Sequence, residues 1–204
     1  MLVVGLTGSI GMGKSAAAEG FRELGIAVFD ADAAVHALYD GPLAAEIDEA
    51  FPGTAVAGKI DRAKLSAALL TAPHRFKDLE AIVHPRVRAM ERAFLHEQAE
   101  KGANISVLEI PLLFESGADK TVDVTVVVSA SPNTQRTRVL ARPGMTGAKL
   151  DALLARQVRD AEKRRRADFV VDTNGPVQSC HAHIAALAVK LSSRKGTAFA
   201  RVWR

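Results

Sequence analysis

The segment Gly8-Ser9-Ile10-Gly11-Met12-Gly13-Lys14-Ser15 decides the fold that this sequence predicts. It satisfies the pattern G-x-x-x-x-G-K-[ST], whose glycines let the backbone turn so tightly that consecutive N–H groups point at bound phosphates. A strand-like run, Leu2–Leu6, precedes the segment, and a helical stretch follows from Ala16 onward. This strand–loop–helix order is the setting that the motif requires, and the helix adds the positive end of its dipole.

The loop therefore predicts a site for ATP with Mg²⁺. Lys14 is placed to reach the β- and γ-phosphates, and the Ser15 hydroxyl is placed to ligate the metal ion. The residues expected to bind ATP are those of the loop and the start of the helix, namely Gly8, Gly11, Met12, Gly13, Lys14, Ser15 and Ala16.

Outward from the loop, short apolar runs alternate with stretches that have helical spacing. The further runs are Ile26–Phe29, Ile105–Ile110, Val122–Val128 and Phe169–Val171. Such alternation favours a parallel sheet flanked by helices, and runs that are apolar at nearly every position suit strands buried on both faces. We expect an α/β fold with a parallel five-stranded core.

The spacing of these runs predicts the organisation of a single domain, 1–204. The interval 31–103 has no convincing strand and is broken by Gly41-Pro42, Pro52-Gly53, Gly58, Pro73 and Pro85, which suggests an inserted helical subdomain. The segment 141–166 begins with turn residues, continues as a charged helix and suits a mobile lid. The nucleotide-binding core is then 1–30, 104–140 and 167–192, and we expect the polar, basic tail from Ser192 to be poorly ordered.

Composition narrows the class of protein further. The single cysteine fits a reducing compartment, and no apolar run approaches the roughly 20 residues that cross a bilayer, so a cytoplasmic protein without a membrane anchor is expected. The net charge of +4 suits a phosphate-rich ligand. One Tyr and one Trp provide almost no stacking platform for single strands, so we expect no nucleic-acid partner. Nothing in the sequence indicates the oligomeric state.

Two carboxylates follow the second strand in Phe29-Asp30-Ala31-Asp32. Sheets of this kind bind ligands at the carboxyl ends of their strands, so these acids are candidates for handling an acceptor hydroxyl. Asp is also among the best residues for capping a helix, and we expect one of the pair to do that and the other to be functional. His36 lies one turn after Asp32; it is either an acceptor contact or a solvated helix residue.

At this point the chain resembles the dephospho-coenzyme A kinase family along nearly its whole length. The resemblance is carried by Gly5-Leu6-Thr7 with the loop that follows, by Asp30-Ala31-Asp32, Ile60-Asp61-Arg62, Leu79-Glu80-Ala81-Ile82-Val83-His84-Pro85, Pro111-Leu112-Leu113-Phe114-Glu115, Gln157 and Ala167–Gly175. The loop alone is unspecific, whereas these segments in the family's order are specific.

The resemblance implies transfer of the γ-phosphoryl group of ATP to the 3′-hydroxyl of the dephospho-CoA ribose, the last step of coenzyme A synthesis. It implies that Asp32 is the base, that Lys14 and Ser15 serve ATP and Mg²⁺, and that Arg142 is a lid arginine, with Arg138 as the competing candidate.

The acceptor pocket would take in Asp32, His36, His84, Pro111, Leu112 and Phe114. His84 precedes a proline, so an extended or turn conformation is expected there. The apolar residues after the third strand are equally compatible with plain core.

Two alternatives stay open at this stage. A nucleoside or nucleotide kinase shares the same core and lid. A nucleotide-dependent switch or nucleic-acid-binding ATPase would use the basic clusters, although a guanine-reading N-K-x-D segment is missing from the sequence.

Overall fold

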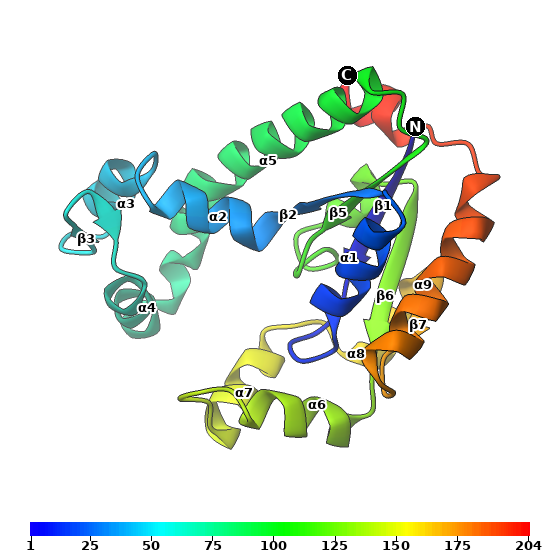
Figure 1. Cartoon of the computed structure of the whole chain (residues 1–204). Helices are drawn as coiled ribbons and strands as arrows, with labels where there is room; N and C mark the ends of the chain where they lie inside the picture. Colours follow the sequence, from blue (N-terminus) through cyan, green and yellow to red (C-terminus); the bar gives the residue numbers. More distant parts are fainter. The chain divides into compact units, whose positions relative to one another are not determined.

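A computed structural model describes all 204 residues, and the chain divides into two compact units (Figure 1). We call the residues Met1–Phe29 with Phe94–Arg204 the core unit, and the residues Asp30–Ala93 the inserted unit.

The core unit is built on the five-stranded sheet that the apolar runs predicted. Its strands stand in the order β2-β5-β1-β6-β7, with bounds β1 (Leu2–Thr7), β2 (Ala27–Asp30), β5 (Ile105–Glu109), β6 (Val124–Ser129) and β7 (Phe169–Asp172). β1 pairs in parallel with β5 and β6, and β6 pairs in parallel with β7. In this register Leu6 lies opposite Glu109, and Ser129 opposite Asp172, so the strands reach their carboxyl ends at one edge.

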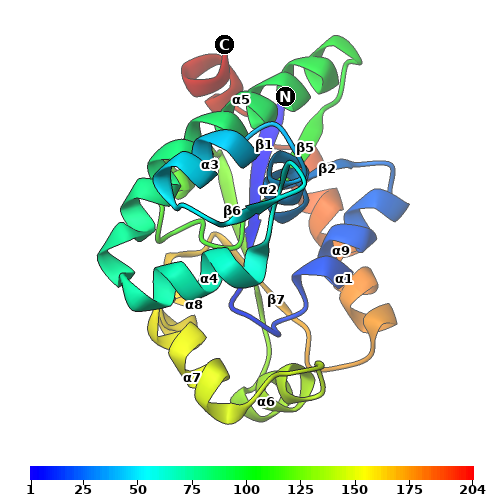
Figure 2. The ribbon, with the colours of Figure 1, turned by 90° about the vertical axis from the view of Figure 1, so that its left-hand side faces the viewer.

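Side chains of β1 alternate between two buried faces. Leu2, Val4 and Leu6 join a hydrophobic cluster with residues of the helices α1 (Lys14–Glu23) and α9 (Val177–Ser192). These two helices pack side by side (Figure 1, Figure 2). On the other face a Cβ on Gly5 would lie 3.1 Å from the Leu113 side chain, which leaves little room for anything larger. Both faces are thus covered, as the all-apolar strands indicated.

The segment between β6 and β7 forms three helices. They are α6 (Pro132–Leu140), α7 (Gly147–Ala155) and α8 (Asp160–Arg166). Ser131 caps α6 by accepting a hydrogen bond from the N–H of Thr134, and Thr146 caps α7 by accepting from the N–H of Lys149. One charged helix was predicted over the later part of this segment. Instead it breaks between α7 and α8, where the N–H of Val158 donates to the Glu115 carboxylate, outside any helix.

The C-terminal tail does not match the prediction of poor order. Trp203, in the short helix η3 (Phe199–Trp203), is 2% exposed, and its Nε1–H donates to the Thr121 carbonyl at 2.7 Å. The Asp123 carboxylate accepts from the N–H groups of Thr197 and Ala198, and from Val3 at the start of β1. The tail is polar in composition, but these buried contacts fix it to the core unit.

The inserted unit is mostly helical, and it also contains a small hairpin. Its helices are α2 (Ala31–Tyr39), α3 (Ala44–Ala50), α4 (Arg62–Thr71), η1 (Pro73–Arg75) and the first part of α5 (Phe76–Glu100). The strands β3 (Ala55–Val56) and β4 (Lys59–Ile60) pair antiparallel around Ala57 and Gly58, both at positive φ. Positive φ at both central residues is the requirement of a tight hairpin turn, so Gly58 closes a hairpin.

Pro85 does not break a helix, which corrects a second prediction. α5 runs through it without interruption, and His84 therefore lies in a helix and not in an extended segment. Proline removes one backbone hydrogen bond, but burial of Val83 and Val87 on the same helix offsets that cost. Beyond Ala93 the helix belongs to the core unit, where Leu95 is fully buried and the Phe94 ring lies 5.6 Å from Phe29. The inserted unit thus ends before residue 103.

Candidate nucleotide site

The glycine-rich loop joins β1 to α1, and its glycines are required sterically. Gly11 and Gly13 have φ of 77° and 83°, a left-handed conformation that side chains disfavour. At Gly8 an added Cβ would lie 2.5 Å from the Val128 side chain and 2.8 Å from its carbonyl oxygen. The loop thus approaches β6 closely. Where it enters α1, the first N–H groups of the helix have no intrahelical acceptor and can bind an anion.

Long-range hydrogen bonds hold the loop in this shape. The Thr173 hydroxyl donates to the Met12 carbonyl at 2.8 Å. Both backbone polar groups of Ile10 are bonded: its carbonyl accepts from Gln135 Nε2 at 2.8 Å, and its N–H donates to Gln157 Oε1 at 3.2 Å. Met12 is buried, with its sulfur 3.1 Å from the N–H of Ala130, so its side chain points away from the ligand space. Met12 therefore has only its backbone to offer a ligand.

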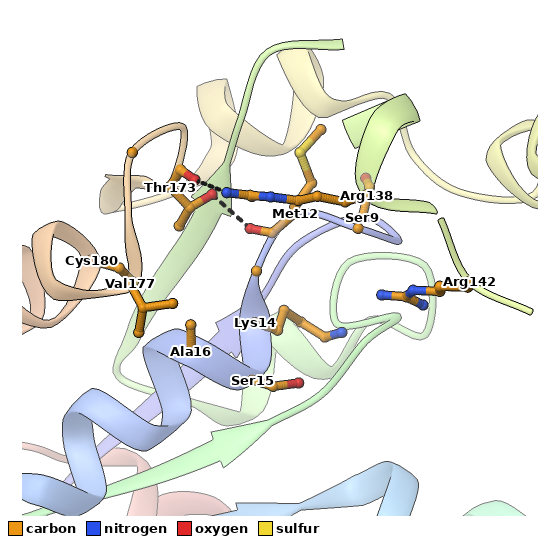
Figure 3. A pocket seen from close by; sticks show the side chains of 13 residues that line it. Ser9, Met12, Lys14, Ser15, Ala16, Arg138, Arg142, Thr173, Val177 and Cys180 are labelled. Carbon is orange, nitrogen blue, oxygen red and sulfur yellow. Dashed lines mark hydrogen bonds between the residues drawn. The ribbon is translucent and has the colours of Figure 1, made fainter. Parts of the chain in front are cut away.

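A cavity of about 290 Å³ opens beside the loop (Figure 3). It is lined by Ser9, Gly11, Met12, Gly13, Lys14, Ser15 and Ala16 on one side, and by Arg138, Arg142, Thr173, Gly175, Val177 and Cys180 on the other. The lining contains three cationic side chains and no carboxylate. A cavity with this charge pattern and free backbone donors suits a polyphosphate.

The two arginines in the cavity differ in what they contact. Arg138 donates to the Thr173 carbonyl at 2.6 Å and extends toward β7. Arg142 has no side-chain partner in the chain, is exposed, and points with Lys14 into the same space (Figure 3). Arg138 thus uses one guanidinium nitrogen on the wall of the cavity, and its Nη1 has no partner, whereas the whole guanidinium group of Arg142 is unbonded.

The β7 side of the cavity was not assigned from sequence. Thr173, Gly175, Val177 and Cys180 follow the last strand and line the cavity's far wall. Burial raises the pKa of the Cys180 thiol, which keeps it neutral. The available signal was topological: Thr173 follows the carboxyl end of a parallel strand, where ligands of such sheets bind.

The predicted acceptor residues of the core unit lie just after β5. Pro111 accepts a hydrogen bond through its carbonyl from the Thr7 hydroxyl at 3.1 Å, which ties this turn to the end of β1. Leu112 is exposed, whereas Phe114 is buried, with the Arg166 guanidinium 4.3 Å above its ring. Leu112 thus has surface to offer a ligand, and Phe114 mainly packs.

The inserted unit carries the remaining predicted residues. Asp30 is the N-cap of α2, accepting from the N–H of Ala33 at 2.9 Å, so one of the two acids does cap the helix. Asp32 lies in the first turn, exposed, with no partner for its carboxylate. His36 is exposed one turn later on α2, and His84 is exposed on α5.

These features together define a P-loop nucleotide-binding protein of the small kinase type. A model of the dephospho-CoA kinase family matches residues 2–179, and the chain belongs to that family. A dephospho-CoA kinase of Rhodopseudomonas palustris is 54% identical over 198 residues, 96% of this chain and 100% of the relative. One of Brucella melitensis is 53% identical, covering 97% and 99% of the two chains.

Solved structures agree with this assignment. A protein of Thermus thermophilus superposes with a TM-score of 0.80 at 35% identity, covering 93% of this chain and 97% of the other. The dephospho-CoA kinase of Campylobacter jejuni gives 0.70 at 25% identity, covering 93% and 96%. The predicted fold class and the predicted kinase reaction of coenzyme A synthesis are thereby confirmed at the level of the family. None of the helices combines the length and apolar character needed to cross a membrane.

Proposed function

We propose that this chain phosphorylates the 3′-hydroxyl of dephospho-CoA, with ATP held by the loop and the hydroxyl activated by Asp32. The observation that carries the donor half is the carboxylate-free cavity in which Lys14 and Arg142 face the same space. Phosphoryl transfer needs little covalent help from the protein; it needs positioning and neutralisation of the charge on the γ-phosphate oxygens.

On the donor side, Lys14 and Arg142 supply that positive charge, and the loop N–H groups bind the β-phosphate. Arg142 lies in the segment between α6 and α7. Closure of this segment over the cavity would expel water and bring the positive charge to the phosphates. Arg138 keeps its bond to Thr173 and orients the far wall of the cavity.

The metal ion in this proposal is Mg²⁺. The Ser15 hydroxyl is exposed and has no hydrogen-bond partner in the chain, so it is free to act as a ligand. No group of three or more His, Cys, Asp or Glu side chains suited to a metal ion occurs, which fits an ion that keeps its waters and is held mainly by phosphates. When bound, Mg²⁺ would neutralise charge that develops on the β- and γ-oxygens.

On the acceptor side, Asp32 accepts the proton of the 3′-hydroxyl as that oxygen bonds to the γ-phosphorus and ADP departs. Two facts support this role: Asp30 already caps the helix, and the Asp32 carboxylate has no other partner. Its position two residues beyond the carboxyl end of β2 is where ligands of parallel sheets are handled. His36, His84, Pro111, Leu112 and Phe114 are proposed to surround the acceptor.

The test is a coupled assay for ADP release with Mg·ATP and a panel of dephospho-CoA, nucleosides and nucleoside monophosphates. We expect turnover of dephospho-CoA only; turnover of a nucleoside or nucleotide without coenzyme A production would contradict the proposal. Asp32→Asn should lower kcat about 10²- to 10⁴-fold with ATP affinity retained. Asp40→Asn is the matched control at the C-terminal end of the same helix, because Asp40 forms only an exposed ion pair with Lys59 at 3.8 Å.

Arg142→Ala tests the donor side separately. It should lower kcat about 10³-fold, the lower end of what an arginine contributes in such transfers. Arg136→Ala is its control, since that arginine is exposed and pairs with Asp151. If Arg142→Ala keeps near-normal turnover while Arg138→Ala does not, Arg138 and not Arg142 supplies the positive charge to the γ-phosphate.

A further inference from the structure

One buried ion pair in the core unit takes no part in the mechanism above. Lys163, on α8, is fully buried, and its Nζ lies 2.9 Å from Oε1 of Glu115, whose side chain is 15% exposed. Removing two charges from water is costly, and apolar residues of similar volume often stabilise a protein equally well. Stability alone is therefore a poor explanation of this pair, and what it holds in place is the better question.

The pair joins two segments that are far apart in the sequence, the turn after β5 and the helix α8. Glu115 lies in the turn that follows β5, and Lys163 lies in the middle of α8. The same Glu115 Oε1 also accepts the N–H of Val158 at 2.8 Å. One carboxylate oxygen thus holds the chain before α8 and the helix itself.

We call the residues 157–163 the brace, because two further bonds attach them to the nucleotide site. The Gln157 side chain accepts the N–H of Ile10, inside the phosphate loop, at 3.2 Å. The Asp160 carboxylate accepts the Ser129 hydroxyl, at the carboxyl end of β6, at 2.8 Å. The brace therefore touches the loop, the sheet edge and the β5 turn within seven residues.

The brace is also the far attachment of the segment that carries Arg142. That segment leaves α6, which holds the Ile10 carbonyl through Gln135, passes through α7 and enters the brace at Gln157. Both flanks of the segment are thus bonded to the backbone of the same residue, Ile10: Gln135 to its carbonyl and Gln157 to its N–H.

From these contacts we propose that Glu115 and Lys163 are positioning residues for phosphoryl transfer. Their ion pair fixes the position of the brace, and the brace fixes the backbone of Ile10 and limits how far Arg142 can reach. The inference rests on the roles proposed above for the loop and Arg142. It predicts that any motion of the segment that carries Arg142 stops short of the brace, whose residues are bonded to the loop and the sheet.

The test separates positioning from stability with a double-mutant cycle. Glu115→Gln and Lys163→Met each leave one buried charge unpaired, so each should lower Tm. The double variant E115Q/K163M has no buried charge and should recover most of the Tm. We expect its kcat to stay about 10²-fold low, with KM for ATP and dephospho-CoA changed less than kcat, because a small misplacement far from the chemistry is enough for such a loss.

Recovery of kcat together with Tm in the double variant would overturn the proposal, because the pair would then be structural only. Should the double variant not fold, Gln157→Leu carries the test: it cuts the bond to Ile10 without touching the buried pair and should give the same fall in kcat. A normal kcat for Gln157→Leu would equally overturn the proposal. Glu97→Gln is the control, since Glu97 lies outside the brace and pairs with exposed Lys101 on α5.

Failure of the proposed function would look different. In that case the wild-type chain makes no coenzyme A, or Arg142→Ala is as active as wild type. If the wild type and Arg142→Ala behave as expected while the brace variants turn over normally, only the inference about Glu115 and Lys163 fails.

Discussion

The Thr173 hydroxyl donates to the Met12 carbonyl at 2.8 Å, joining two residues that lie 161 positions apart in the chain. The same hydroxyl lies 3.1 Å from the Ser129 carbonyl, and the side chain is buried. The end of β7 therefore holds the middle of the phosphate loop.

Thr173→Val keeps the shape of the side chain and removes this bond. The Met12 carbonyl is left without its donor inside the protein, which costs about 1–3 kcal/mol. We expect a free energy of unfolding lower by that amount in urea titrations and a higher KM for ATP. Thr71→Val is the control, because the Thr71 hydroxyl bonds only to the Ala68 carbonyl on an exposed turn. An unchanged KM would show that the loop keeps its shape without Thr173.

Gly8→Ala places a Cβ against β6, where the Val128 carbonyl lies 2.8 Å away and cannot give way. Overpacking of this kind costs about 1–3 kcal/mol. We expect weaker ATP binding by calorimetry, about tenfold for each 1.4 kcal/mol of strain that falls on the loop. Gly41→Ala has open space around its added methyl group and should change neither stability nor affinity by a comparable amount.

Asp30→Ala should separate the cap from the proposed base. The Asp30 carboxylate accepts the N–H of Ala33, and loss of an N-cap typically costs about 1 kcal/mol. We expect a lower free energy of unfolding, with the fall in kcat far smaller than for Asp32→Asn. Equal losses of kcat in the two variants would mean that the start of α2, and not the Asp32 carboxylate, is what turnover requires.

Glu91 in α5 should make stability depend on pH. Burial raises its pKa to about 7, against the opposing effect of Arg88 at 3.6 Å. Between pH 4.5 and pH 7 the folded state therefore keeps a proton that the unfolded chain has released. The contribution of Glu91 to stability is fully present below pH 4.5 and is lost as the pH rises through 7.

Glu91→Gln removes this dependence. Its free energy of unfolding, relative to wild type, should rise by up to about 3 kcal/mol between pH 4 and pH 8. Glu97→Gln, at an exposed site paired with Lys101, is the control. A difference that is flat across this range would mean that the pKa of Glu91 is the same in the folded and unfolded states.

Trp203 is the only tryptophan of the chain, so its fluorescence reports directly on the tail. With 2% exposure, its emission should be blue-shifted and protected from acrylamide, both features being lost on unfolding. Trp203→Ala should cost about 3–5 kcal/mol. Val189→Ala, at a 73% exposed site, should be nearly silent. Ready quenching of the native protein would contradict the docked tail.

The sequence predicted best what depends on local backbone chemistry. The glycines of the phosphate loop, the five apolar strands and the capping acid after β2 all express preferences of a few adjacent residues, and all are found as expected. Pro85 is the local signal that misled, because the burial of Val83 and Val87 outweighs one lost hydrogen bond. The tail misled because composition gives no weight to a single buried side chain. Trp203 anchors an otherwise polar segment to the core unit.

By itself, then, the sequence determined that the chain has a phosphate loop, which sheet surrounds it and which family it resembles, since those follow from short segments read in order. Only the tertiary structure decided that Thr173 holds Met12, that Gln157 holds Ile10, and that Arg138, unlike Arg142, donates a hydrogen bond to Thr173. Each of these contacts joins segments far apart in the chain. Strand order and register bring them together, and no local preference of either partner encodes them.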